Sequence, residues 1–215
     1  MILASASPRR RDLLTAAGLV FDVEPSLYDE TLHTRPSSPQ AAAVDLAVGK
    51  ALAVARQHAG EHAVVLAADT IVAVGPDDSF ELLGKPVDAE DERRMLRLLS
   101  NSRHQVVTGV CVVDCRGVPV GAGPVGVGPV GVGPGLRTGV ETTYVTMRTL
   151  SSADIEAYVA TDEWRDKAGG YAIQDGADRF VTCLEGGGRD NVVGLPVALA
   201  LRLIAEGLAP TRSAP

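Results

Sequence analysis

Cysteine is scarce in this sequence of 215 residues, which contains three: Cys111, Cys115 and Cys183. An odd number leaves at least one thiol unpaired within the chain, and the spacings fit neither a zinc site nor a redox motif. This scarcity argues against a secreted, disulfide-stabilised protein. We therefore expect a reducing, cytoplasmic compartment.

Basic residues are outnumbered as well. The chain has 20 lysines and arginines against 27 aspartates and glutamates, which gives a formal net charge of −7 at pH 7. An acidic protein is repelled by nucleic acids and by anionic membranes, so we expect general binding to neither. The few basic residues that lie inside motifs are correspondingly more informative.

Long uninterrupted apolar runs are missing too. The apolar stretch at the N-terminus is too short for the hydrophobic region of a signal peptide. Residues 118–136 are uncharged over a membrane-like length, but glycine and proline recur too often there for a spanning helix. We therefore expect no membrane segment.

The remaining composition, 46% hydrophobic and 22% charged residues, is that of a globular protein. A chain of this length can bury a substantial core in one domain, or in one domain with two lobes. We predict a single domain over residues 1–208 and a frayed tail at 209–215.

A glycine- and proline-rich stretch interrupts this domain. Residues 117–139 contain repeated Gly-Pro-Val-Gly-Val units and are predicted to be a peripheral low-complexity insertion between strands at 106–114 and 140–148. The repeats contain nominal Gly-x-Gly-x-x-Gly fingerprints. These are false matches, because prolines interrupt them and a strand follows where dinucleotide binding needs a helix.

The first residues combine a strand, a turn and a helix. Residues 2–4 are apolar and predict a short buried strand, while Ser7 and Pro8 are typical of an N-cap and a first helical position. Arg9 and Arg10 then lie in the first turn, where their charge opposes the helix dipole. An anion held there would remove the conflict, which favours a phosphate site. The alternative is a solvated turn whose arginines pair with carboxylates.

An aspartate separates two apolar runs. Residues 63–68 and 71–74 each predict a strand, with Asp69 and Thr70 between them. Aspartate is disfavoured inside a strand and costly to bury, but it is tolerated where a strand ends at a cleft or where it binds a metal. Asp69 is therefore the best catalytic candidate, as a proton acceptor or a metal ligand. A turn or capping aspartate is the alternative.

A hairpin is predicted to present a lysine. Residues 71–74 and 80–83 can pair across the turn between them. Gly84 and Pro86 then restrict the backbone around Lys85, whose point charge suits a phosphate. An exposed turn lysine is the alternative.

Capping and periodicity signals predict helices at residues 38–59, 88–99, 151–160 and 196–206, and short strands at 19–23 and 180–184. The apolar stripe of the first of these helices consists of Val44, Val48, Ala51, Leu52 and Ala55, and that of the second of Met95, Leu96, Leu98 and Leu99. Lys50 lies off its stripe, so a solvent-facing lysine is one interpretation. His58 and His62 are separated by Gly60, which should end the helix, so a zinc site there is not expected. Because helices and strands alternate but one strand pair is a hairpin, we expect an α/β domain with a mixed central sheet and a cleft.

Several segments together resemble the Maf family of nucleoside triphosphate pyrophosphatases. In chain order they are Ser-Ala-Ser-Pro-Arg-Arg at 5–10, Tyr-Asp-Glu at 28–30, Ala-Ala-Asp-Thr-Ile-Val at 67–72, Gly-Lys-Pro at 84–86, Asp-Lys-Ala-Gly-Gly-Tyr-Ala-Ile-Gln at 166–174 and Val-Val-Gly-Leu-Pro at 192–196. No single segment would suffice. Their order and their spread from residue 2 to about residue 200 make the resemblance specific, although the insertion departs from the family's shorter connection.

The resemblance implies a mixed central sheet flanked by helices, with two lobes around a cleft, similar to the inosine triphosphate pyrophosphatase fold. It implies hydrolysis of a nucleoside triphosphate between the α and β phosphates, with a divalent cation, Mg²⁺ or Mn²⁺. Asp69 would be catalytic, and Glu30 and Asp69 would bind the metal. The residues implied at the substrate are Ser7, Arg9, Arg10, Lys50, Thr70, Lys85 and Gln174.

Arg9, Thr70 and Gln174 match the branch of the family that prefers dTTP and UTP. A neutral amide at Gln174 could read the edge of a base. Three alternatives remain open: a broad-specificity pyrophosphatase, a nucleotide-binding regulator of septum formation without turnover, and a nucleotidyl- or sugar-phosphate transferase. The nucleoside triphosphate is the expected partner, and a homodimer is compatible with the sequence.

Overall fold

The central feature of the computed structural model is a mixed sheet. The structure describes residues 1–30, 37–76, 79–118 and 135–208. Within them seven strands form one sheet in the order β2-β1-β3-β5-β6-β7, with β4 paired to β3 outside this path. The strands are β1 Ile2–Leu3, β2 Asp22–Val23, β3 Val64–Val74, β4 Glu81–Leu83, β5 Arg103–Asp114, β6 Leu136–Met147 and β7 Val181–Gly186. β1 is parallel to β2 and β3, and the other pairs are antiparallel.

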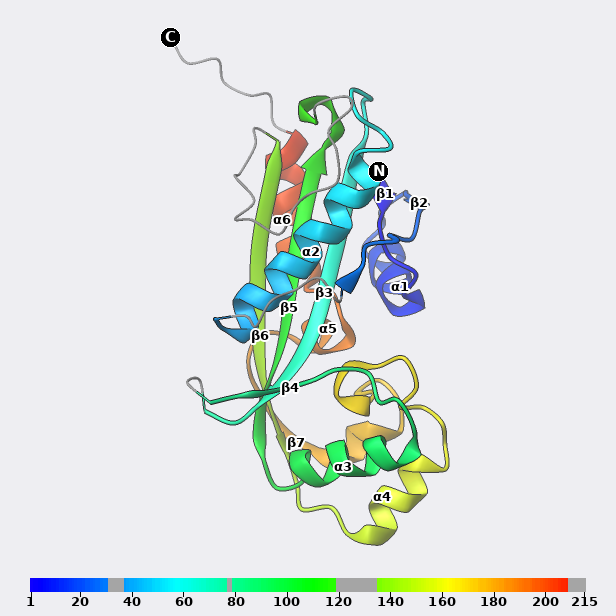
Figure 1. The fold of residues 1–215 in the computed structure, drawn as a ribbon, viewed down its shortest axis with the longest axis vertical. Coiled ribbons are helices and arrows are strands. Elements are labelled where there is room, and N and C mark those ends of the chain that lie inside the picture. The colour runs from blue at the N-terminus through cyan, green and yellow to red at the C-terminus, as the bar shows by residue number, and fades with distance from the viewer. Residues whose placement is uncertain (31–36, 77–78, 119–134, 209–215) are drawn as a thin grey trace.

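Two helices, α2 (Pro39–Ala55) and α6 (Val197–Leu208), cover opposite faces of one half of this sheet, here called the large lobe (Figure 1). In the described part of the chain the α-helices are α1 Pro8–Ala16, α2 Pro39–Ala55, α3 Ala89–Leu99, α4 Ser152–Val159, α5 Arg189–Val193 and α6 Val197–Leu208. Side chains alternate across a strand, so Val65 and Ala67 of β3 join the apolar cluster of α2, while Leu66 and Ala68 join that of α6. The first half of β3, which lies in the large lobe, is therefore apolar on both faces of the sheet.

The long strands β3, β5 and β6 continue into a second half, the small lobe, where α3 and α4 pack (Figure 1). The 3₁₀ turns η3, Ala168–Gly170, and η4, Gly176–Phe180, also belong to this half. Its core contains Leu96, Tyr158, Trp164 and Phe180, each at most 2% exposed. The α/β fold and the division into two lobes agree with the prediction from the sequence. No helix among the described residues is long and apolar enough to cross a membrane.

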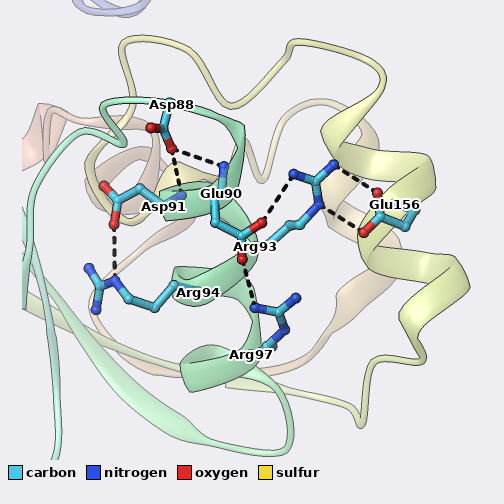
Figure 2. Close-up of polar contacts among 7 residues, drawn as sticks. All are labelled: Asp88, Glu90, Asp91, Arg93, Arg94, Arg97 and Glu156. Atoms are coloured by element: carbon cyan, nitrogen blue, oxygen red, sulfur yellow. Dashed lines mark hydrogen bonds and ion pairs between the residues drawn. The ribbon is translucent and has the colours of Figure 1, made fainter.

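Exposed ion pairs join α3 to α4 on the outside of the small lobe (Figure 2). The Arg93 guanidinium donates to both carboxylate oxygens of Glu156, at 2.8 and 2.9 Å. On α3 itself Arg94 donates to Asp91 at 3.0 Å. Surface pairs of this kind contribute little stability individually, but the two-pronged contact fixes how the two helices are aligned.

The predicted helix starts are confirmed by their hydrogen bonds. Ser38 accepts from the backbone N–H of Ala41, and Asp88 accepts from two backbone N–H groups of α3. Ser151 and Asp154 form a reciprocal capping box at the start of α4. Ser7 occupies the N-cap position of α1 but makes no capping hydrogen bond with its side chain.

The expected break in β3 is wrong. Asp69 and Thr70 lie inside one continuous strand, where they face Gly109 and Thr108 of β5 in register. The strand continues because the polar side chains of both residues find partners, described below, and because the backbone keeps its pairing with β5. The predicted hairpin is confirmed, since β4 pairs with the end of β3.

Other boundaries also differ. The helix expected over 38–59 ends at Ala55, and the strand expected over 19–23 is reduced to β2. Leu98, expected in the core, is 38% exposed because the buried face of α3 is formed by Glu92, Met95, Leu96 and Leu99. β5 begins at Arg103 and β6 at Leu136, so the end of the predicted insertion at 117–139 belongs to a strand. Residues 119–134 of that insertion, and the tail at 209–215, lie outside the described residues.

Candidate active site

A cavity of about 890 Å³ lies between the two lobes. Its walls come from the turn between β1 and α1, the middle of β3, and the segments around residues 84–85, 166–174 and 192–194. All nine site residues expected from the sequence line it: Ser7, Arg9, Arg10, Glu30, Lys50, Asp69, Thr70, Lys85 and Gln174. Residues that are up to 167 positions apart in the sequence thus face one space.

Arg10 is held in place by three neutral acceptors from different parts of the chain. Its Nε donates to the backbone carbonyl of Gly194 at 2.8 Å, Nη1 to Ser5 Oγ at 3.2 Å and Nη2 to Thr70 Oγ1 at 3.1 Å. Burial lowers the pKa of Arg10, and the negative charge of Asp69 opposes this shift. A guanidinium has five N–H groups, so two remain for an incoming anion.

The alternative in which both arginines pair with carboxylates does not describe this turn. Within the described residues Arg10 makes no ion pair, and Arg9 donates to the backbone carbonyl of Asp166 at 3.4 Å. Arg11, the next residue, is the one that lies near a carboxylate, that of Asp12 at 3.9 Å. The positive charge of Arg9 and Arg10 at the start of α1 is therefore available to a ligand.

Two carboxylates converge on one lysine at the cavity floor. Lys50 Nζ lies 2.5 Å from Asp69 Oδ1 and 2.7 Å from Glu30 Oε1. The Lys50 side chain is 15% exposed, so the solvent-facing interpretation of this lysine is wrong. Burial raises the pKa of Asp69, while Lys50 and Arg10 oppose the rise. A carboxylate with a raised pKa is a better proton acceptor near neutral pH.

A close approach of two segments brings Glu30 to this position. A Cβ atom on Gly49 would lie 2.3 Å from the Tyr28 ring, so the loop before Glu30 can pack on α2 only because residue 49 is glycine. Lys50 is the next residue on the same helix. The sequence contained this signal as a glycine within a helix that otherwise consists of good helix formers.

The donor set suits a hard divalent cation. Mg²⁺ is commonly bound by one or two carboxylates together with substrate phosphates and water. Glu30 and Asp69 already converge on a positive group, the Lys50 ammonium. No cluster of three or more acidic, histidine or cysteine side chains that could hold a metal occurs among the described residues. The residues therefore fit a cation that shares its coordination with the phosphates of a ligand.

The wall contributed by the small lobe carries Lys85 and Gln174, both exposed at the cavity. The backbone N–H of Gly169 donates to the carbonyl of Gly84 at 2.9 Å and thereby ties the segment of Gln174 to that of Lys85. Gln174 Nε2 donates to Asp175 Oδ2 at 2.8 Å, which leaves its carbonyl oxygen without a partner among the described residues.

Ser5 and Lys167 line the cavity but were not predicted as site residues. Ser5 is 8% exposed, accepts from Arg10 and also from the backbone N–H of Ser7. Lys167 donates to the backbone carbonyl of Glu163, and burial together with Arg9 lowers the pKa of Lys167. Both lie inside the segments that carry the family resemblance, and that was the available signal for them.

Comparisons with known proteins cover nearly the whole chain. A family model described as "Maf-like protein" matches residues 1–207. A dTTP/UTP pyrophosphatase of Pyrococcus abyssi is 42% identical over 98% of this chain and 97% of its own length. Proteins of the same name from Anaeromyxobacter dehalogenans and Deinococcus radiodurans are 44% and 41% identical, each over 95% of this chain and over 92% and 91% of their own lengths. Because the family model matches nearly the whole chain and these relatives are more than 40% identical to it, the chain belongs to the Maf family.

Proposed function

We propose that this protein is a nucleoside triphosphate pyrophosphatase that hydrolyses dTTP and UTP to the monophosphate and pyrophosphate. The observation that carries the proposal is the arrangement of opposite charges in one cavity: Lys50, held by Asp69 and Glu30, lies in the same space as Arg10. Relatives named dTTP/UTP pyrophosphatase that are 41–44% identical over nearly the whole chain support it.

Each group has a defined task in this reaction. Arg9, Arg10 and Lys85 bind the phosphates, which are the most highly charged part of the substrate. Asp69 takes the proton of the attacking water as the bond between the α and β phosphates breaks. The ammonium of Lys50 orients the carboxylate of Asp69 and limits repulsion between that carboxylate and the phosphates.

Glu30 and Asp69 are the residues that would hold a divalent cation. When bound, such a cation neutralises phosphate charge and polarises the phosphoryl oxygens. Mg²⁺ and Mn²⁺ both match the oxygen donors.

The preference for pyrimidine nucleotides is assigned to Gln174, supported by its place at the cavity rim and by its free carbonyl oxygen. That oxygen can accept from the N3–H of thymine or uracil, and the amide can donate to a ring carbonyl once it leaves Asp175. Thr70 contributes differently, because its hydroxyl is bonded to Arg10. We also propose a cytoplasmic location, supported by three free cysteines, two of them buried. A homodimer is a further proposal, and sedimentation analysis of the purified protein tests it.

The test is a screen of dTTP, UTP, CTP, ATP, GTP and modified triphosphates with separate detection of pyrophosphate and of orthophosphate. The expected result is stoichiometric pyrophosphate and monophosphate, fastest with dTTP and UTP, and abolished in Asp69→Asn. Orthophosphate with a nucleoside diphosphate would contradict the proposed bond. Binding without turnover would indicate a regulator, and pyrophosphate release that requires a sugar phosphate or another acceptor would indicate a transferase.

A further inference from the structure

Arg10 is supported from behind the cavity wall by a chain of hydrogen bonds. Thr70 Oγ1, which accepts from Arg10, lies 3.0 Å from Thr108 Oγ1 on the neighbouring strand β5. Thr108 Oγ1 lies 3.1 Å from the backbone carbonyl of Asn191. Thr108 is fully buried and is absent from the cavity lining, so it cannot touch a ligand in the cavity.

The chain has a direction, because each threonine hydroxyl has a single proton. The proton of Thr108 satisfies the buried carbonyl of Asn191, which leaves the lone pairs of Thr108 to accept from Thr70. The other acceptor near Thr70 is the Gly194 carbonyl, which is farther away at 3.3 Å and already accepts from Arg10 Nε. The proton of Thr70 therefore points to Thr108, and its lone pairs face the guanidinium of Arg10.

The far end of the chain is anchored in the sheet. Asn191 is fully buried, and its Nδ2 donates to the backbone carbonyl of Val106 on β5 at 3.0 Å and to Thr143 Oγ1 on β6 at 2.9 Å. Arg10 Nε is held by Gly194, three residues after Asn191. Residues 191–194 thus hold the guanidinium twice: directly, through the Gly194 carbonyl at Nε, and indirectly, through the two threonines at Nη2.

We propose that Thr108 is a positioning residue for the pyrophosphatase reaction, acting through Thr70 to orient Arg10 toward the phosphates. This inference rests on the proposed function, in which Arg10 binds a phosphate. Valine at position 108 would preserve the shape of the side chain but remove the acceptor for the proton of Thr70. That proton would then turn to the Gly194 carbonyl, and the lone pairs of Thr70 would no longer be directed at Arg10 Nη2.

The experiment measures kcat and KM for dTTP and, by calorimetry, the affinity for inorganic tripolyphosphate with the divalent cation present. Thr108→Val should raise both KM and the tripolyphosphate Kd about 5- to 20-fold, as expected when a buried hydrogen-bond partner is lost. Thr108→Ser keeps the hydroxyl and should restore both values to within about twofold of the wild type. Tyr158→Phe is the matched control, because it removes an equally buried hydroxyl that accepts from the backbone N–H of Ala172 and does not line the cavity.

The decisive measurement combines Thr108→Val with Arg10→Ala. If Thr108 acts through Arg10, the double variant should bind tripolyphosphate no more weakly than Arg10→Ala alone. Equal losses in the two backgrounds, or equal effects of Tyr158→Phe and Thr108→Val, would overturn the inference. Thr108→Ala replaces the valine variant if that variant folds poorly by circular dichroism. A wild type that binds tripolyphosphate but releases no pyrophosphate would contradict the proposed function alone, since the coupling to Arg10 is measured by binding.

Discussion

Buried polar groups are treated in opposite ways in two regions of this protein. Behind the cavity, Thr108 and Asn191 are fully buried and hydrogen-bonded, and of their side-chain polar atoms Asn191 Oδ1 alone has no partner among the described residues. In the core of the small lobe, Glu92 is also fully buried, but neither of its carboxyl oxygens has a hydrogen-bond partner among the described residues. Nearby, His104 Nε2 contacts the Tyr171 hydroxyl at 2.9 Å, while its Nδ1 has no partner there.

The difference shows how each region tolerates its polar atoms. Near the cavity Asp69, Lys50 and Arg10 each have partners within hydrogen-bond distance, which offsets the cost of burying them. In the small lobe the charge is avoided instead. Burial raises the pKa of Glu92 to about 8 and lowers the pKa of His104 to about 4, so both groups are neutral at pH 7.

Glycine makes room for the neutral carboxyl. Gly170 lies in η3 at φ 71°, and a Cβ atom there would be 1.6 Å from Glu92 Oε2. Besides burial, the negative charge of Asp91 on the same helix raises the pKa of Glu92. Glu92 in turn contributes to raising the pKa of Tyr158 on α4, for which burial is the main cause. In the small lobe, therefore, Glu92 is packed into the core as a neutral side chain. Near the cavity, by contrast, the polar groups orient one another through hydrogen bonds.

The largest effect on activity is expected from a substitution at Asp69, in the cavity between the lobes. Asp69→Asn keeps the shape of the side chain but can neither take a proton nor hold a cation well. Loss of a positioned base typically lowers kcat by about 10²- to 10⁴-fold. Steady-state pyrophosphate release measures this, with circular dichroism as the check on folding. A folded variant with near-normal kcat would remove Asp69 from the mechanism.

In the small lobe, burial of Glu92 should instead make the stability of the fold depend on pH. Glu92 is protonated in the folded state up to a pKa of about 8, against 4.5 for an exposed glutamate, so the folded state binds more protons between these values. Stability should therefore fall as pH rises through this window, by up to about 1.4 kcal/mol per pH unit, and level off above it. His104 has the opposite sign, since its pKa falls from 6.5 to about 4 and stability rises with pH between them.

The contribution of Glu92 is separable above the window of His104, between pH 6.5 and 8. Urea unfolding of the wild type and of Glu92→Gln at several pH values in this range gives the comparison. The wild type should lose stability steadily relative to the variant, whose amide does not titrate. Parallel curves would mean that Glu92 is ionised in the folded protein and that the contrast between the two regions is wrong.

A third prediction separates the two walls of the cavity. Gln174→Glu should lower kcat/KM for dTTP and UTP about 5- to 150-fold, because an ionised carboxylate cannot donate to a ring carbonyl. It should affect purine triphosphates less, whereas substitutions of Arg9 and Lys85 should weaken all triphosphates about equally. A matrix of the three variants against four nucleotides tests this. Equal losses for all four nucleotides in Gln174→Glu would show that the residue does not read the base.

The smallest effect is expected from shortening the low-complexity insertion. Replacing residues 119–134 by a short Asn-Gly turn should leave kcat and KM for dTTP unchanged, because the repeats offer few core-forming side chains and loop length affects closure entropy only weakly. The segment ends before Gly135, whose carbonyl accepts from Asp114 N–H at 2.9 Å and should be kept. A shortened protein that folds but no longer binds nucleotide would show that the insertion is functional.

Features that depend on neighbours along the chain could be predicted from the amino-acid sequence. The starts of α2, α3 and α4 were predictable because Ser38, Asp88 and Ser151 bond to N–H groups two or three residues away. The pairing of β3 with β4 was predictable from two short, mostly apolar runs on either side of a Pro-Asp-Asp sequence that is typical of a turn. Nine of the residues that line the cavity were also predicted, because the family resemblance implied them, although the composition of the chain does not.

The tertiary structure decided the fate of each polar residue that has a distant partner. Asp69 continues a strand instead of ending one, because Lys50 and the pairing with β5 satisfy it. Glu92 lies at the buried spacing of Met95, Leu96 and Leu99, yet its charge predicts exposure, and only the space over Gly170 makes its burial possible. Propensity and periodicity describe a residue and its neighbours in sequence, whereas the free energy of burying a charge depends on groups that the fold brings from elsewhere.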